Sequence, residues 1–247
     1  MAKKKTAQTT KKKTAKKQSF WKKAIRFVLW IMAGFIVLSF ALVSLYRFVN
    51  PPVTPLMMIR ITQQLTSGND ARLQKKWIDI EDVSPNMIRA VIAAEDNLFV
   101  KHWGIDTKAV KRAVEHNKKS ERKRGASTIS QQTAKNVFLW PTRSFTRKGF
   151  ELYFTLLIEW IWGKERIMEV YLNVIETGNG IYGVEKASQT YFKKSSSRLT
   201  QGEAALIAAL LPSPRKYSVT SPGPYMQKRQ GQIQSLMGKI ETLKIED

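Results

Sequence analysis

The sequence predicts a mainly α-helical protein, with one helical domain behind a single membrane-spanning helix. Three observations support this fold class. Residues 27–46 carry no charge, apolar residues later in the chain recur at intervals of three and four, and no long segment alternates between apolar and polar residues. A length of 247 residues allows one domain and an appendage. A hydrophobic content of 43% is enough for a core and excludes wholesale disorder.

The uncharged segment 27–46 is long enough to cross a bilayer. Twenty helical residues span roughly 30 Å, the thickness of the hydrocarbon core. A cleaved signal peptide is the alternative, but its apolar region is normally shorter and ends in a small-residue cleavage site. The residues before Arg47 show no such site. We therefore expect a retained, single-pass anchor at 27–46 and a separate domain over 47–247.

The formal net charge of +23 has two sources. Residues 1–26 contain eleven bases and no acid, which leaves 31 bases against 19 acids in the remainder. The positive-inside rule predicts a cytoplasmic N-terminus and a periplasmic or extracellular domain, held at the cytoplasmic (inner) membrane. Because the tail 1–26 has almost no aromatic residues, we expect a disordered segment that attracts anionic membrane lipids, and no nucleic-acid partner. The absence of cysteine excludes disulfides and thiol nucleophiles.

Capping signals and apolar spacing divide the domain into helices. Ser84 and Pro85 are typical of an N-cap and a first helical position, and Thr200 with Glu203 forms a capping-box pattern. Further helices are predicted at about 106–117, 127–139, 145–162, 164–175, 185–194, 201–211 and 224–243. One apolar face of the last helix is made by Ile233, Leu236, Met237, Ile240 and Leu243. A short strand is predicted near Met57–Ile61.

Two carboxylates end the apolar helix that begins at Ser84. Glu95 and Asp96 are followed by aromatic residues and by His102. A carboxylate in such a poorly solvated place has a raised pKa, which suits general acid–base chemistry. The alternative is an exposed helix end with solvated acids, and a lone histidine is more often structural than catalytic.

Two polar segments follow. Residues 125–136 combine hydroxyls and amides with Lys135, which suits an anionic or sugar ligand at a helix N-terminus. Residues 143–151 place Arg143, Arg147 and Lys148 around Glu151, which suits phosphate or pyrophosphate. The alternatives are a capped helix with a buried polar network and a salt bridge between Arg147 and Glu151.

The glycines of residues 178–183 match the dinucleotide-binding pattern GxGxxG, but the pattern is misleading. The fingerprint requires a preceding strand, whereas residues 165–175 have helical spacing. These glycines therefore indicate a tight turn or the close approach of a ligand.

Taken in order, these segments resemble the peptidoglycan glycosyltransferases of glycosyltransferase family 51. The matching segments are EDNLFVKHWG at 95–104, GASTISQQTAKN at 125–136, RKGFELYFTLLIE at 147–159, KERIMEVYLN at 164–173 and GNGIYGVEKASQTYF at 178–192. The resemblance implies a lysozyme-like helical head with a small membrane-facing jaw at 105–124. This segment contains eight basic and three acidic residues. Since the chain ends at Asp247, it resembles the monofunctional form without a transpeptidase domain.

The resemblance also implies a reaction and a set of roles. Lipid II and the growing glycan chain are polymerised into β-1,4-linked strands, with inversion and release of undecaprenyl pyrophosphate. Glu95 matches the catalytic base and Glu151 the second catalytic glutamate, which acts directly or through a divalent cation such as Mg²⁺ or Mn²⁺. The matched substrate-binding positions are Ser127, Gln131, Gln132, Lys135, Asn136, Arg143, Arg147 and His102. Within residues 164–173, Glu169 and Asn173 are expected to tie one helix to its neighbours. Penicillin-binding proteins or divisome proteins are the implied protein partners.

Two other functions stay open at this point. A lysozyme-like muramidase or lytic transglycosylase would also use one glutamate, but it would not need the cations of residues 143–151. An inactive membrane scaffold of wall synthesis would not need Glu95 and Glu151.

Overall fold

The computed structural model describes residues 2–68, 70–121, 125–142 and 144–243, with side chains described from residue 21 onward. The chain divides into two units, 1–46 and 47–247. The first consists of most of helix α1 (Ala2–Phe48), whose segment Trp21–Phe48 is long and apolar enough to cross a membrane. The prediction of a disordered tail is wrong, because the helix begins at Ala2. Alanine, lysine and glutamine are strong helix formers, and no proline or glycine interrupts them before Gly34.

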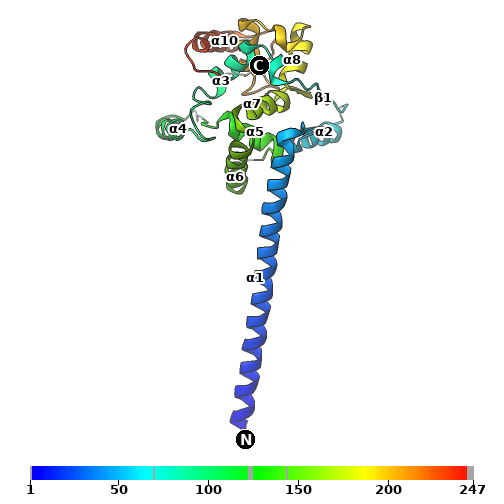
Figure 1. Ribbon diagram of the computed structural model, residues 1–247, viewed down its shortest axis with the longest axis vertical. Coiled ribbons are helices and arrows are strands. Elements are labelled where there is room, and N and C mark those ends of the chain that lie inside the picture. The colour runs from blue at the N-terminus through cyan, green and yellow to red at the C-terminus, as the bar shows by residue number, and fades with distance from the viewer. Residues whose placement is uncertain (1, 69, 122–124, 143, 244–247) are drawn as a thin grey trace. The chain divides into compact units, whose positions relative to one another are not determined.

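The second unit is mainly helical, as predicted (Figure 1). Its helices are α2 (Pro55–Thr66), α3 (Pro85–Glu95), α4 (Thr107–Lys119), α5 (Ile129–Phe138), α6 (Phe145–Ile161), α7 (Gly163–Val174), α8 (Val184–Phe192), α9 (Gln201–Leu210) and α10 (Pro224–Met237). Two 3₁₀ turns, Ile80–Asp82 and Ser196–Arg198, lie among them.

Two sequence predictions about element type and length are wrong. The strand expected near Met57–Ile61 is part of α2, because the Thr54 hydroxyl accepts a hydrogen bond from the Met57 amide and Pro55 occupies the first turn. Helix α10 ends at Met237, where Gly238 is the C-cap, so Ile240 and Leu243 lie beyond it. The predicted capping box of Thr200 and Glu203 is confirmed at the start of α9.

Two groups of helices form the core. Residues 204–210 of α9 are all buried, and α9 packs against α3 and α10. Helix α5 packs against α6 and α7 in the second group. A helix that is apolar all round needs neighbours on every side. Burial of α9 therefore fixes α3, whose last residue is Glu95.

A three-stranded sheet connects α7 to α8. Its strands are β1 (Gln74–Lys75), β2 (Glu176–Gly178) and β3 (Ile181–Tyr182), in the order β1-β3-β2, with β1 parallel and β2 antiparallel to β3. The GxGxxG segment forms this hairpin. A Cβ on Gly183, whose φ is +79°, would lie 2.9 Å from the Asn173 carbonyl oxygen. These glycines therefore allow backbone to approach backbone.

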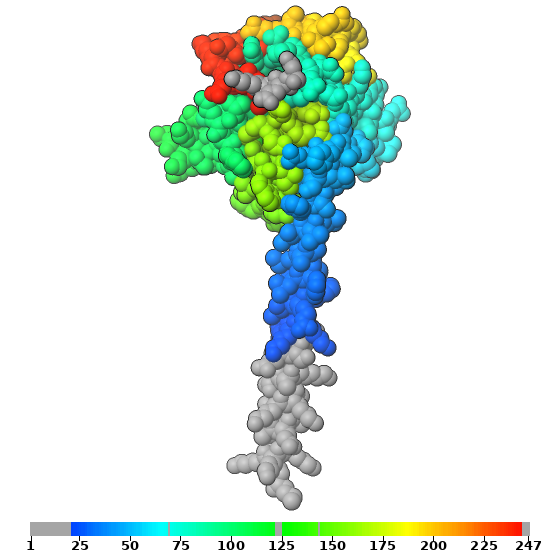
Figure 2. Space-filling view, in the orientation of Figure 1, coloured from blue at the N-terminus to red at the C-terminus, as the bar shows by residue number. Residues whose placement is uncertain are grey.

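Helix α4 lies in the segment expected to form the jaw. None of its residues is buried, and the Asp106 carboxylate caps its N-terminus by accepting from the Ala109 amide at 2.8 Å. In the space-filling view the corresponding green segment projects from the edge of the second unit (Figure 2). Residues 122–124 of the expected jaw lie outside the described residues. The membrane-facing role of α4 stays a prediction.

The close approach at Gly183 predicts a loss of stability on Gly183→Ala. Gly183 has φ +79° and ψ +158°, a conformation essentially confined to glycine that costs another residue about 1–3 kcal/mol, and the contact with the Asn173 carbonyl adds to that cost. Thermal unfolding of the full chain should show a lower Tm. The matched control is Gly231→Ala in α10, where the added Cβ meets open space and should raise stability by about 1 kcal/mol. Equal effects of the two substitutions would contradict this interpretation.

Candidate active site

Glu95 is the last residue of α3 and is largely shielded from water. Six residues of this helix are buried before it, and the Gln132 side-chain amide donates a hydrogen bond of 2.7 Å to its Oε2 atom. Burial raises the pKa of the Glu95 carboxyl, with a smaller contribution from Asp96. Gln132, Arg229 and Lys135 act in the opposite direction. The alternative of a solvated helix end is therefore wrong for Glu95.

Asp96 and His102 form a structural link beside Glu95. The His102 Nε2 atom lies 2.9 Å from one carboxylate oxygen of Asp96, and the other oxygen accepts from the Ile129 amide at 3.1 Å. This carboxylate therefore joins the end of α3 to the start of α5. His102 lies outside the linings of the two cavities described below.

Helix α5 begins with a capping box that uses one of the expected substrate-binding residues. Gln131 is buried, and its side chain accepts a hydrogen bond from the Thr128 amide, while the Thr128 hydroxyl accepts from the Gln131 amide. The Thr128 hydroxyl also donates to the Gly104 carbonyl at 2.6 Å. Gln131 therefore fixes the start of the helix and does not line either cavity.

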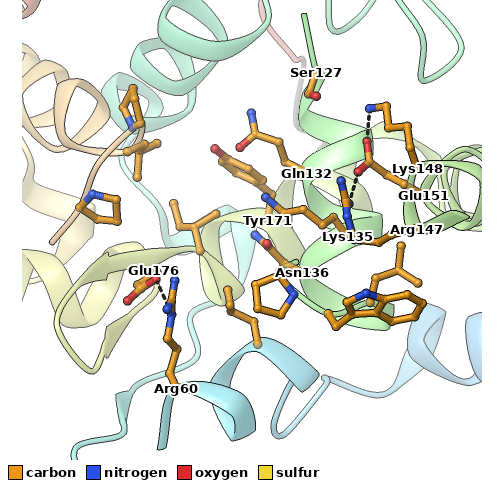
Figure 3. Close-up of a pocket in the computed structure, with 18 residues that line it drawn as sticks. Arg60, Ser127, Gln132, Lys135, Asn136, Arg147, Lys148, Glu151, Tyr171 and Glu176 are labelled. Atoms are coloured by element: carbon orange, nitrogen blue, oxygen red, sulfur yellow. Dashed lines mark hydrogen bonds and ion pairs between the residues drawn. The ribbon is translucent and has the colours of Figure 1, made fainter. Parts of the chain in front are cut away.

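The larger cavity, of about 470 Å³, brings together most of the remaining predicted residues (Figure 3). Its polar lining consists of Arg60, Ser127, Gln132, Lys135, Asn136, Arg147, Lys148, Glu151, Tyr171 and Glu176. Burial lowers the pKa of Lys135, and the charges of Arg147 and Lys148 act in the same direction. The negative charges of Glu151 and Glu95 oppose this shift, so both glutamates stabilise the protonated form of Lys135.

Helix α6 supplies the charges at one end of this cavity. The Ser144 hydroxyl accepts a hydrogen bond from the Arg147 backbone amide and caps the N-terminus of the helix. Since Glu151 follows Arg147 by four residues and Lys148 by three, the three side chains share one face. Arg147 Nη1 lies 2.6 Å from Glu151 Oε2, and Lys148 pairs with the other oxygen. The predicted salt bridge is thus present, and it lies in the cavity wall. Arg143 lies outside the described residues.

A second cavity, of about 280 Å³, shares Ser127 with the first. Its lining includes Glu95, Asp96, Ser127, Arg112 and Arg229. Ser127 lines both cavities, and Gln132 of the larger cavity donates to Glu95 of the smaller one, so the Glu95 carboxyl lies close to both. This arrangement can hold two reactants, one on each side of a base.

Several charged residues of these cavities could not be predicted from the sequence. Arg229, on α10, donates to the Ala94 carbonyl at 2.9 Å beside Glu95. Arg60, on α2, forms an ion pair of 3.5 Å with Glu176 at another part of the larger cavity. These residues lie outside the matched charge clusters and carry no local signal, because the tertiary packing of α2 and α10 brings them to the cavities.

The donor set does not fit a metal ion held by the protein alone. Among the residues described, no three His, Cys, Asp or Glu side chains are grouped to bind a metal. The carboxylate of Glu151 is already paired with Arg147 and Lys148, whereas Mg²⁺ and Mn²⁺ prefer several free carboxylate or carbonyl oxygens.

Helix α7 ties these elements together, as predicted for Glu169 and Asn173. The side-chain amide nitrogen of Asn173 donates to the Ile78 carbonyl at 2.8 Å, and its side-chain oxygen accepts from the Ile78 backbone amide at 2.9 Å. The Glu169 carboxylate accepts from the Trp77 indole and from Arg166. The segment before α3 is therefore held against the helix that carries Tyr171.

A family model and several similar proteins all identify the same family. A family model described as Transglycosylase matches residues 61–238. A biosynthetic peptidoglycan transglycosylase of Bdellovibrio bacteriovorus is 49% identical over 216 residues, which cover 87% of this chain and 86% of that protein. Proteins of the same name from Bacteroides thetaiotaomicron and Caulobacter vibrioides are 49% and 52% identical, over 89% and 80% of this chain and 88% and 84% of their own lengths. The chain therefore belongs to the transglycosylase family.

Proposed function

We propose that this protein is a peptidoglycan glycosyltransferase of cell-wall biosynthesis that polymerises lipid II into β-1,4-linked glycan strands. The observation that carries this proposal is the position of Glu95. Its carboxyl is partly shielded from water and lines the smaller cavity, and its partner Gln132 lines the larger one together with the cations of α5 and α6. The family and the names of the relatives support the same activity.

Glu95 acts as the general base in this proposal. The acceptor sugar lies in the smaller cavity with its 4-hydroxyl directed toward Gln132 and the larger cavity, and this hydroxyl gives a proton to the Glu95 carboxylate while its oxygen attacks the anomeric carbon of the donor. The bond from that carbon to the pyrophosphate oxygen breaks as the new bond forms, so the anomeric centre is inverted. The hydrogen bond from Gln132 holds the carboxylate in place.

The pyrophosphate of the donor lies in the larger cavity. Lys135, Arg147 and Lys148 supply positive charge where negative charge develops on the leaving group. Glu151 holds Arg147 and Lys148 in position through its two ion pairs. Ser127 and Asn136 line the same cavity and contact the sugars or phosphates. No step is routed through a divalent cation, which stays a prediction from the resemblance.

The apolar helix Trp21–Phe48 supports membrane anchoring. A polyprenyl-linked substrate requires an active site at the membrane, and the basic tail favours a cytoplasmic N-terminus with a periplasmic or extracellular catalytic domain. Arg47 donates to the Ile161 carbonyl at the end of α6, where Trp160 is 68% exposed. Arginine and tryptophan suit the membrane interface. Membrane lipids are thus proposed partners, and penicillin-binding or divisome proteins stay predictions.

The glycan-cleaving alternative is less well supported. A hydrolase or lytic enzyme has no pyrophosphate leaving group and no use for three cations in one cavity. Labelled lipid II given to the purified full chain distinguishes the two functions. Glycan strands are the expected product. Cleavage of preformed glycan without polymerisation would contradict the proposal, and binding of lipid II without turnover would favour the inactive scaffold.

Glu95→Gln is expected to lower polymerisation by roughly 10²–10⁴-fold, because the amide cannot accept the proton. Binding of lipid II should be largely retained. The Tm at neutral pH should stay equal or rise, because a buried carboxyl with a raised pKa destabilises the folded state once it ionises. The matched control is Glu241→Gln, at an exposed ion pair with Lys101. Near-normal turnover in Glu95→Gln would contradict the mechanism.

The pH dependence should report the raised pKa of Glu95. A base must be ionised, so kcat should fall on acidification at a pH above the ordinary glutamate range. Gln132→Leu removes a hydrogen bond that lowers this pKa, and it should move the acidic limb of the profile to higher pH. A limb that stays in place, or moves to lower pH, would show that another group controls it.

Lys135→Ala is expected to slow elongation by about 10-fold to 100-fold, because a charged hydrogen-bond donor to the pyrophosphate is lost. Lys228→Ala, at an exposed position of α10, is the control. Initial rates at several lipid II concentrations measure the effect. Equal rates for the two variants would remove Lys135 from the site.

A further inference from the structure

Tyr171 carries a buried hydroxyl that nothing in the described part of the chain satisfies. The residue lies on α7, its side chain is fully buried, and it contributes to the lining of the larger cavity. Its hydroxyl oxygen has no hydrogen-bond partner among the described residues. Figure 3 shows the hydroxyl directed toward the part of the cavity where Gln132 lies.

An unsatisfied buried hydroxyl costs about 1–3 kcal/mol of stability. Phenylalanine would fill the same space without that cost, so packing alone gives no reason for the oxygen. A group bound in the cavity would supply the missing partner. Buried polar groups that lack a partner in the protein alone are found at functional sites, where a ligand provides the missing hydrogen bond.

The surroundings of Tyr171 determine how its hydroxyl can act. Burial raises the pKa of Tyr171 well above its usual range, and the charges of Glu95 and Asp96 raise it further. The hydroxyl therefore stays protonated at neutral pH and can donate a hydrogen bond. Gln132, toward which the hydroxyl is directed, lines the same cavity and donates to Glu95 at 2.7 Å, so the hydroxyl lies near the proposed base (Figure 3).

We propose that the Tyr171 hydroxyl donates a hydrogen bond to the sugar oxygen that Glu95 deprotonates. This inference rests on the proposed function of Glu95. The sugar oxygen loses its proton to Glu95 and forms a bond to the anomeric carbon, while the electrons of the broken bond leave with the pyrophosphate. Tyr171 keeps its own proton throughout. Its hydrogen bond is strongest while the sugar oxygen carries partial negative charge, so it stabilises the transition state.

Two other tyrosines provide matched controls. Tyr182, on β3, also has a buried hydroxyl without a partner among the described residues, but it lies outside the linings of both active-site cavities. Tyr191, on α8, donates to the Thr177 carbonyl at 2.8 Å, so its hydroxyl has a structural role. Tyr171 thus has an unpaired hydroxyl at the site, Tyr182 has an unpaired hydroxyl away from it, and Tyr191 has a paired hydroxyl. Comparing the three distinguishes a role in the reaction from a role in stability.

The experiment compares Tyr171→Phe, Tyr182→Phe and Tyr191→Phe in the purified full chain, with labelled lipid II as the substrate and thermal unfolding as the second measurement. Tyr171→Phe is expected to lower kcat by about 10-fold to 100-fold with a smaller change in KM, and to leave Tm equal or higher. Tyr182→Phe should leave both rate and Tm nearly unchanged or raise Tm. Tyr191→Phe should lower Tm and leave the rate per folded molecule unchanged.

Full activity of Tyr171→Phe would overturn the inference. A fall in Tm similar to that of Tyr191→Phe would also overturn it, because the hydroxyl would then have a structural partner. Glu95→Gln, measured in parallel, separates this inference from the proposed function. If Glu95→Gln is inactive while Tyr171→Phe is fully active, only the role of Tyr171 fails. If Glu95→Gln is active, the proposed base itself fails.

Discussion

Burial of the Glu95 carboxyl is the constraint on which the site depends. A carboxylate is stable in such a place only if other groups offset its lost hydration. Gln132 provides one hydrogen bond, and Arg229 and Lys135 provide positive charge from two different helices. These groups oppose the effect of burial without cancelling it, so the pKa stays raised. The same balance makes Glu95 a better base than an ordinary exposed glutamate.

The surrounding helices keep this balance fixed through polar contacts between segments far apart in the sequence. Asp96 joins the end of α3 to the first amide of α5. Behind these residues, the buried Glu159 carboxylate accepts from the Ser130 hydroxyl and pairs with Lys164 at 2.7 Å. Lys164 also donates to the His102 carbonyl. Each contact links two of the matched segments, so α3, α5, α6 and α7 form one frame around the carboxyl.

Much of this frame could be predicted from the sequence, because its signals are local. Capping residues such as Ser84 and Thr200 predict helix starts, and an apolar run that ends in a carboxylate predicts Glu95. Other features depend on tertiary packing. The helix at Met57 depends on its cap at Thr54, and Arg229 reaches Glu95 only because α10 packs against α3. The sequence shows Tyr171 as one more residue on a buried face, and only the structure shows that its hydroxyl is unpaired.

The role of Glu95 as the base depends on a raised pKa of its carboxyl in the folded protein. The most direct test is a carboxyl titration of the full chain by infrared or carbon NMR difference spectroscopy, with Glu95→Gln used to assign the signal. The carboxyl of Glu95 should give a signal that is lost in Glu95→Gln and that titrates above the ordinary glutamate value of 4.5. A Glu95 signal that titrates at or below 4.5 would rule out the proposed base, because the carboxyl would then be solvated or fully paired.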